Sequence, residues 1–408
     1  MSSAGIVSAP VTSVAPRTFA GLQHSVITLA STHFIVDAYN NIYAPLLPLF
    51  IPHLGLSLTA VGTLAMCFQM ANSVSQLGFG ALADRWRPRA LILGGPIVAV
   101  TILSFIGLSQ SALMLGAILV FGGLGGAAFH PPAAALVYRL ADHRKGLAMS
   151  AHLSGGSLGF ALSPLVFVPT IARMGLEWSP LIMLPGVLAL SWTLRQVPPM
   201  SRPEAHERSS FASLRPAAVP LALVYFTVVL RTATSYGFMT FAPTLLTQRG
   251  LSIDQASAAV FLYLLTSGIG GFFGGPLSDR FGARRVMVAT LVASVPFLAL
   301  APSLSPWGFT AMLAIGGLLL QSTLPVSVTY AQSLTKAGAA TVSSLMMGFA
   351  WGMGSLAVPF IGLAADRWGI NTALLGLAVV PLLAACLAGS LPKTENIDQS
   401  EEAVPAGS

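Results

Sequence analysis

Long apolar stretches separated by short polar loops make up almost the whole chain. A helix needs about 20 mostly apolar residues to cross a bilayer. The stretches that satisfy this length lie near residues 22–50, 57–83, 90–109, 112–139, 147–173, 178–197, 216–247, 254–278, 286–305, 307–334, 339–365 and 370–391. This pattern predicts an all-α membrane protein with twelve transmembrane helices.

The longest polar connection, residues 198–215, separates six predicted helices from six. We therefore expect an N-terminal six-helix bundle over residues 21–197, a cytoplasmic linker over 198–215 and a C-terminal six-helix bundle over 216–392. Residues 1–20 and 393–408 are small or polar. We expect both segments to be disordered tails, because they offer little apolar surface to bury.

The two predicted bundles repeat each other in sequence. Residues 80–85 read Gly-Ala-Leu-Ala-Asp-Arg, and residues 275–280, which lie 195 positions later, read Gly-Pro-Leu-Ser-Asp-Arg. Pro48 and Pro164 recur at the same spacing as Pro243 and Pro359. Several matches at one offset indicate two parallel, pseudo-symmetric repeats, an arrangement that places a transporter's binding site at the midplane between them.

Composition and charge agree with a membrane protein. Hydrophobic residues make up 54% of the chain and charged residues 8%, whereas a soluble domain carries about 25% charged residues. The net charge of +7 is not a nucleic-acid signal, because the basic residues lie in short loops. Only Arg173, Arg249 and Arg367 fall in the loops of one side, so the positive-inside rule places both termini in the cytoplasm.

One acid lies in the middle of an apolar stretch. A charge at mid-membrane costs roughly 2.5–3.5 kcal/mol on insertion scales, so an acid there is rarely without a use. Asp37 is that acid, and His33 precedes it by four residues, one helical turn away on the same face. Because burial penalises the charged form of a carboxyl, we expect Asp37 to carry a proton and His33 to assist it.

One base, Arg231, is also intramembrane. An offset of 194 residues, which also relates Gly122 and Gly123 to Gly316 and Gly317, places Arg231 opposite Asp37 on the equivalent helix of the second half. We expect the two charges to form an ion pair in one state, which would offset part of the cost of inserting each. Protonation of Asp37 would then free the guanidinium, whose planar shape suits a phosphonate, phosphate or carboxylate.

Further polar residues within the apolar stretches must face a cavity or another helix, since lipid offers them no hydrogen bonds. We expect them to contribute to substrate binding together with Arg231. These residues are Asn40, Asn41, Tyr43, Gln69, His130, His152 and Tyr236, with Gln321 as a further candidate in the second half.

The two repeated loops carry a second kind of chemistry. In each, a small residue lets two helix ends approach, and the acid four positions later can face a neighbouring helix N-terminus or a basic side chain. We expect this contact between the acid and its neighbour to act as a conformational gate, since it must break when that side of the protein opens. The gate residues are Gly80, Asp84 and Arg85 in the first loop and Gly275, Asp279 and Arg280 in the second.

These loops resemble the cytoplasmic signature of the major facilitator superfamily, Gly-x-Leu-x-Asp-Arg-x-Gly-Arg/Lys-Arg/Lys. The second loop fits better, because the first has Arg87 where the family prefers Gly. Residues 121–131, which read Phe-Gly-Gly-Leu-Gly-Gly-Ala-Ala-Phe-His-Pro, narrow the resemblance to the fosmidomycin resistance protein family of drug exporters. Residues 348–354 and 362–366 agree with it, and the resemblance spans residues 22–391.

The resemblance implies a monomeric, proton-coupled antiporter of the inner membrane that exports a small organic compound or drug, with an anionic phosphonate such as fosmidomycin as a candidate substrate. An uptake symporter for an organic anion or sugar remains the alternative, because one proton site serves either direction. A non-transporting receptor would need no charges at mid-membrane. We find no phosphate-binding loop, nucleophile–base pair or Cys/His cluster at metal spacing, and so expect no enzyme, cofactor, metal or nucleic-acid partner.

Overall fold

The computed structural model describes residues 18–19, 22–141, 145–198, 217–334, 342 and 344–392. The predicted tails and linker lie almost wholly outside this part of the chain. Thr18 and Phe19, which we assigned to a disordered tail, instead pair with Gln23 and Leu22 in a short antiparallel hairpin of β1 (Thr18–Phe19) and β2 (Leu22–Gln23). The rest of the described chain is helical.

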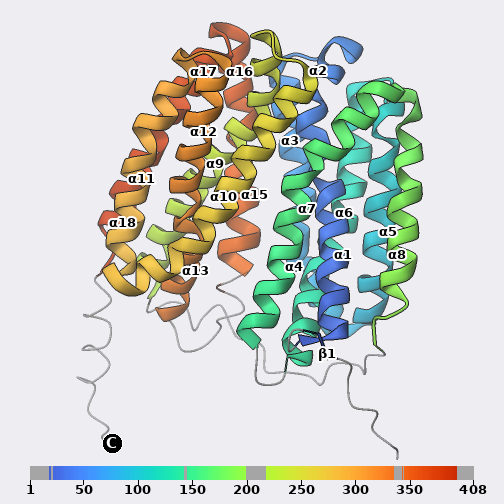
Figure 1. Ribbon diagram of the computed structural model, residues 1–408. Helices are drawn as coiled ribbons and strands as arrows, with labels where there is room; N and C mark the ends of the chain where they lie inside the picture. Colours follow the sequence, from blue (N-terminus) through green and yellow to red (C-terminus); the bar gives the residue numbers. More distant parts are fainter. Residues whose placement is uncertain are drawn as a thin grey trace, which may run out of the picture.

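Two helical bundles stand side by side, one from each half of the sequence (Figure 1). The first contains α1 (His24–Asn40), α2 (Tyr43–Leu54), α3 (Leu58–Gln69), the π-helix η1 (Met70–Val74), α4 (Ser75–Arg85), α5 (Pro88–Ser104), η2 (Phe105–Leu108), α6 (Ala112–Leu140), α7 (Lys145–Met174), η3 (Leu176–Ile182) and α8 (Met183–Leu194).

The second bundle begins at α9 (Ala218–Gln248). It continues with α10 (Ile253–Phe281), α11 (Ala283–Leu300), η5 (Ala301–Ser303), α12 (Pro306–Gln321), α13 (Thr323–Ser333), the π-helix η6 (Ser344–Phe349), α15 (Ala350–Ser355), α16 (Val358–Trp368), α17 (Ile370–Ala378) and α18 (Val380–Gly389).

Several predicted spans are divided into shorter helices, and proline explains two of the divisions. A proline ring clashes with the carbonyl four residues earlier and removes one helical hydrogen bond. Pro45 lies four residues after Asn41, where α1 gives way to α2, and Pro325 lies four residues after Gln321, where α12 ends. Each apolar stretch therefore still crosses the bundle, but with a bend at mid-depth.

Ten helical segments in the described chain are long and apolar enough to cross a membrane. The other two predicted stretches are helical as well, as α3–η1–α4 and as η3–α8. The first of these contains Gln69, Asn72, Ser73 and Gln76, which lower its hydropathy, and α8 is short. The all-helical membrane fold is confirmed, whereas the count of twelve membrane spans stays a prediction.

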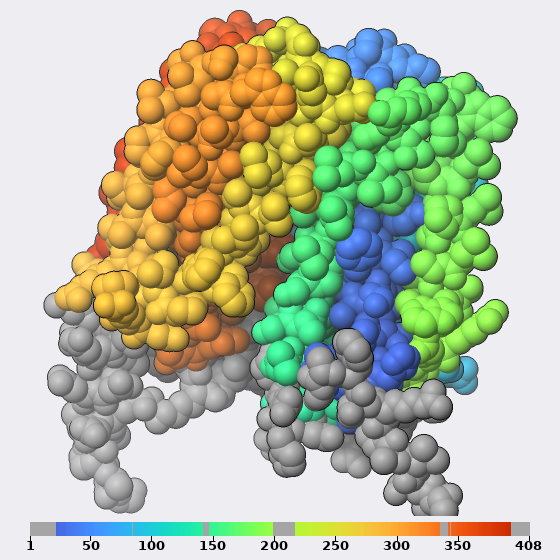
Figure 2. Space-filling model, viewed as in Figure 1, coloured from blue at the N-terminus to red at the C-terminus, as the bar shows by residue number. Residues whose placement is uncertain are grey.

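The two ends of the bundles differ in how closely the halves pack. We call the end that carries the start of α1 and the end of α18 the terminal face, and the opposite end, which carries the loops at Gly55, Gly175, Gly250 and Gly369, the distal face (Figure 1). Toward the distal face, α3 packs on α16 and α7 packs on α10. Toward the terminal face, Figure 2 shows a recess between α7 and α10.

Candidate functional site

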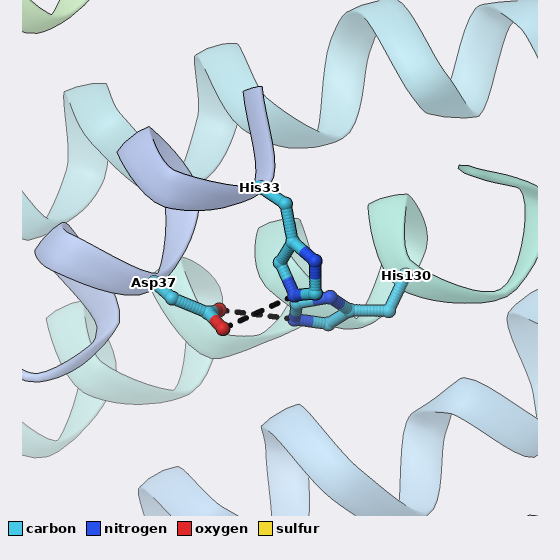
Figure 3. A group of neighbouring side chains, drawn as sticks. All are labelled: His33, Asp37 and His130. Atoms are coloured by element: carbon cyan, nitrogen blue, oxygen red, sulfur yellow. Dashed lines mark ion pairs between the residues drawn. The ribbon is translucent and has the colours of Figure 1, made fainter. Parts of the chain in front are cut away.

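Four polar side chains meet inside the first bundle. His33 and Asp37 lie one turn apart on α1, and Nε2 of His33 is 3.1 Å from Oδ2 of Asp37. His130 on α6 reaches the other carboxylate oxygen, with its Nε2 3.4 Å from Oδ1 (Figure 3). The ring of His152 on α7 lies 4.4 Å from the ring of His33, centroid to centroid. Three helices thus bring their ionisable groups to one buried cluster.

Glycines on α7 make this convergence possible. A Cβ atom on Gly156 would lie 2.5 Å from Nε2 of His33 and 2.6 Å from Oδ2 of Asp37. Gly155 and Gly159 would meet the backbone of α1 at Ala30 and Phe34 in the same way. Small residues at such spacing let two helices approach closely. The glycine-rich stretch of α7 therefore leaves the space that the Asp37 cluster occupies.

Hydrogen bonding fixes where protons must lie in this cluster. Nδ1 of His33 is 2.9 Å from the backbone carbonyl of His152, and a carbonyl only accepts, so Nδ1 carries a proton. The other ring nitrogen faces the carboxyl of Asp37. Two lone pairs would repel each other at that distance, so one proton lies between them, either on the ring or on the carboxyl. Removing that proton forces the pair apart or requires another cation.

The same atoms form a ligand set that a transition metal accepts. The donor atoms of His33, Asp37 and His130 lie within 4.8 Å of one another, and two imidazoles with one carboxylate recur in metal sites. The two measured separations, 3.1 and 3.4 Å, are also those of hydrogen bonds or close ion pairs. The geometry of the cluster therefore fits shared protons without a metal.

A pocket lies next to this cluster, between the two bundles. Five of the polar residues that we predicted to contribute to substrate binding border it, namely Asn40, Asn41, Tyr43, Gln69 and Tyr236. The remaining lining residues are Ala44, Ala65, Phe68, Phe160, Met239, Thr240 and Val358. Nδ2 of Asn40 donates to Oδ1 of Asp37 at 3.3 Å, so one amide connects the cluster around Asp37 to the pocket.

Two of these lining residues also hold the pocket wall in place. Nδ2 of Asn41 donates to the carbonyl of Phe160 at 2.8 Å, and the hydroxyl of Tyr43 donates to the carbonyl of Val61 at 3.1 Å. Both bonds tie the break between α1 and α2 to a neighbouring helix. They also satisfy polar groups that would otherwise be buried without partners.

The buried base of the second bundle has only neutral partners. Arg231 on α9 is 2% exposed. It donates to the side-chain carbonyl of Gln321, and its Nη2 donates to the hydroxyl of Thr232 at 3.0 Å. Its Nε has no partner among the described residues. Tyr236, five residues later on the same helix, borders the pocket.

The ion pair that we predicted between Asp37 and Arg231 in one state is not formed among the described residues in this conformation. Asp37 pairs with His33 and His130, and no ion pair joins it to Arg231 within the described residues. The repeat offset correctly equates positions on α1 and α9, but each side chain satisfies its polar groups inside its own bundle. Arg231 therefore keeps an uncompensated positive charge.

Two of the histidines that we predicted to contribute to substrate binding do not border the pocket. We assigned His130 to the substrate, but it contacts Asp37 instead and does not border the pocket. His152 supplies its backbone carbonyl to His33, and its Nδ1 has no partner in the described part of the chain. Both residues lie in the cluster around Asp37.

The repeated loops lie on the terminal face, at the ends of α4 and α10. The side chain of Asp84 is outside the described residues. Asp279 is exposed and has no polar partner within the described chain, while Arg280 stacks over the ring of Phe281 at 5.2 Å. After α10 the chain turns at Gly282 with φ +85°, whereas Arg87 after α4 has φ −99°. The departure of the first loop from the signature thus changes its turn.

Some residues at the site gave little signal in the sequence. Met239 and Thr240 lie three and four positions after Tyr236 and so share its helix face, which a stricter use of periodicity would have found. Asn72, in the π-helix η1, has a buried Oδ1 that faces Gly126. Apolar lining residues such as Phe68 and Val358 are indistinguishable in sequence from those that face lipid.

Comparison with known proteins gives a consistent result. The family model described as "Major Facilitator Superfamily" matches residues 29–229 and 224–405. An uncharacterised MFS-type transporter of Bacillus subtilis is 29% identical over 91% of this chain and 93% of its own length. The fosmidomycin resistance protein of Escherichia coli is 28% identical over 87% of this chain and 89% of its own.

Among solved structures, a bacterial homologue of the human lysosomal transporter Spinster, in an inward-facing and occupied conformation, is similar in fold. Its TM-score is 0.77 at 16% sequence identity, and the match covers 94% of this chain and 98% of the Spinster homologue. At this identity the likeness concerns the fold alone.

Proposed function

Because this chain belongs to the major facilitator superfamily and is therefore a transporter and not an enzyme, we propose that it exports a small organic anion. We propose that the export occurs in exchange for protons, by alternating access. A phosphonate such as fosmidomycin is the first candidate substrate, since a relative at 28% identity is named for resistance to it. Two separate charged sites support the proposal, one in each bundle.

The main support for an anionic substrate is the isolated charge of Arg231. A buried cation is costly unless it is paired, and no carboxylate in the described chain pairs with Arg231. An anionic substrate would supply the missing charge. The planar guanidinium of Arg231 suits the oxygens of a phosphonate or carboxylate, and Tyr236, five residues later on the same helix, borders the pocket between the bundles.

The coupling ion would bind at Asp37. One proton lies between Asp37 and His33 for the reason given above, and Asn40 connects that carboxyl to the pocket. Loss of the proton leaves the carboxylate facing a ring lone pair, which favours a different arrangement of α1, α6 and α7. Proton release and the shape of the pocket are then coupled, as exchange transport requires.

We further propose that α3–η1–α4 and η3–α8 also cross the membrane, which gives twelve spans. By the distribution of Lys and Arg, the terminal face is cytoplasmic and the protein lies in the inner membrane. The bacterial relatives agree with this location. We propose that the protein acts as a monomer, as the family resemblance implies.

Proton release from everted membrane vesicles tests the function. An acidic interior would be imposed, and phosphonates, carboxylates and cationic drugs would be added one class at a time. Dissipation of the gradient by anions only supports the proposal. Dissipation by cationic drugs but not by anions would overturn the substrate class. Anion accumulation driven by protons moving the same way would instead identify an uptake symporter.

A further inference from the structure

A third copy of the gate signature lies on the opposite side of the molecule. Residues 362–369 read Gly-Leu-Ala-Ala-Asp-Arg-Trp-Gly, and residues 275–282 read Gly-Pro-Leu-Ser-Asp-Arg-Phe-Gly. In both, a glycine precedes the acid by four residues, and Arg, an aromatic residue and Gly follow it. The second copy ends α10 on the terminal face, whereas the third ends α16 on the distal face.

The two copies share a backbone conformation as well as a sequence. Gly282 ends α10 with φ 85° and ψ 140°, and Gly369 ends α16 with φ 83° and ψ 153°. Such positive φ values are accessible to glycine at little cost and are unfavourable for other residues. The third copy is therefore the same structural unit, placed at the other end of the transport path.

In the third copy the acid is engaged across the two bundles. Asp366 accepts hydrogen bonds from the backbone N–H groups of Leu58 and Thr59, at 2.8 Å each, and from the hydroxyl of Thr59 at 2.6 Å. Leu58 and Thr59 are the first two residues of α3, so the carboxylate lies at a helix N-terminus, where a negative charge is favoured. An acid of the second bundle thus caps a helix of the first.

The glycine of the copy holds the two helices close enough for this cap. A Cβ atom on Gly362 would collide with the carbonyl of Leu58, and one on Gly62 would lie 2.5 Å from the carbonyl of Val358. By contrast, nothing lies within 4 Å of a Cβ atom built on Gly275, and Asp279 has no polar partner within the described chain. The distal copy thus joins the two bundles, whereas the copy at the end of α10 makes no such contact among the described residues.

A weaker contact occupies the repeat-related position on the distal face. Thr59 corresponds to Asp254 at the offset of 195 residues, and Asp254 accepts from Nη2 of Arg173 at 2.6 Å. This pair joins the start of α10 to the end of α7, as the Asp366 cap joins the start of α3 to the end of α16. Its side chains are 67% and 46% exposed, so water screens it.

We propose that Asp366 is the gating residue of the distal face, and that its cap on α3 alternates with engagement of Asp279 on the terminal face during transport. The cap must break for the distal face to open, and water can then solvate the two N–H groups that it releases. The inference uses the proposed function only in assuming alternating access; it depends on neither the substrate nor the coupling ion.

Spin labels at Glu177 and Thr372, which are exposed on the distal face of the first and second bundles, would report opening. The distance between them would be measured in purified protein with Cys67 and Cys386 changed to serine, without substrate or proton gradient. Asp366→Asn removes the charge and one acceptor, and we expect the open-to-closed population ratio to rise about tenfold. Thr59→Val, which keeps the helix, should raise it less.

Asp279→Asn is the matched comparison. It removes the equivalent acid from the terminal face, so it should destabilise the distal-open state and shift the distances in the opposite direction. Unchanged distances in both Asp366→Asn and Thr59→Val, or shifts of the same sign in Asp366→Asn and Asp279→Asn, would overturn the proposal. Because no substrate is present, failure here leaves the proposed transport function untouched, and failed transport leaves the gate untouched.

Discussion

Nε2 of His33 lies 3.1 Å from Oδ2 of Asp37, while Nδ1 of the same ring is held 2.9 Å from the carbonyl of His152. The second contact fixes one proton on the ring, and the first therefore requires another proton between ring and carboxyl. This relationship makes the pair sensitive to the loss of a single proton. It is the basis of the first two predictions.

Asp37→Asn should abolish proton-coupled transport without preventing folding. The amide has nearly the shape of the carboxyl and can still accept from Asn40, but it cannot take up or release a proton. Proton release on substrate addition, measured in everted vesicles at equal protein abundance, checks this. Normal coupled flux in the variant would remove Asp37 from the mechanism.

Gly156→Ala should impair the proton site from a neighbouring helix. The added methyl group would lie 2.5 Å from Nε2 of His33 and 2.6 Å from Oδ2 of Asp37, so the pair must separate. We expect at least about a tenfold loss of coupled transport, since displacing a charge-assisted hydrogen bond costs about 1.5–3 kcal/mol.

Gly94→Ala on α5 is the matched control for that substitution. Nothing lies within 4 Å of a Cβ atom at Gly94, and Gly→Ala within a helix stabilises it by up to about 1 kcal/mol. Transport by Gly94→Ala should therefore equal that of the unchanged protein. An equal loss in both variants would point to a general sensitivity of the helices, and not to the proton site.

Arg231→Ala should weaken the binding and transport of anionic substrates much more than those of neutral ones. The loss for an anion should be about tenfold or more, because a charge-assisted hydrogen bond contributes about 1.5–3 kcal/mol. Arg231→Lys keeps the charge but not the planar fork, so it should retain part of the anion binding. Transport constants for a matched anionic and neutral pair would measure the difference; equal losses for both would indicate a structural role.

Arg173→Gln and Asp254→Asn should each change stability by no more than about 1 kcal/mol, as is usual for exposed ion pairs. The pair is short, at 2.6 Å, but largely exposed. Thermal unfolding in detergent at low and high salt checks this, and added salt should erase the small difference. A loss of several kcal/mol would show that the pair is a stronger contact between the bundles than its exposure implies.

The polar positions inside the bundles could be predicted well because lipid imposes a simple rule. Asn40, Asn41, Gln69 and Tyr236 were expected to avoid lipid, and all four border the pocket between the bundles. The proximity of His33 to Asp37 follows from helix periodicity alone. In each case the sequence suffices because the relevant contact is local or concerns only the choice between lipid and interior.

Contacts between helices could not be predicted in this way. The repeat offset suggested that Arg231 pairs with Asp37, but the offset equates positions and does not state where side chains point. His130 is 93 residues from Asp37 in sequence, and only the packing of α6 on α1 brings them together. The cap that Asp366 places on α3 likewise could not be predicted, because a sequence signature does not reveal which helix end its acid faces.

The sequence by itself determined the membrane-spanning stretches, the twofold repeat and the set of polar residues that must be buried, because hydrophobicity, periodicity and internal repetition are properties of the chain alone. Only the tertiary structure decided which of those residues contact Asp37, which base has no charged partner among the described residues, and which acid caps α3 across the two bundles. Those outcomes depend on distances of a few ångströms between helices, which close packing at glycines such as Gly156 and Gly362 sets.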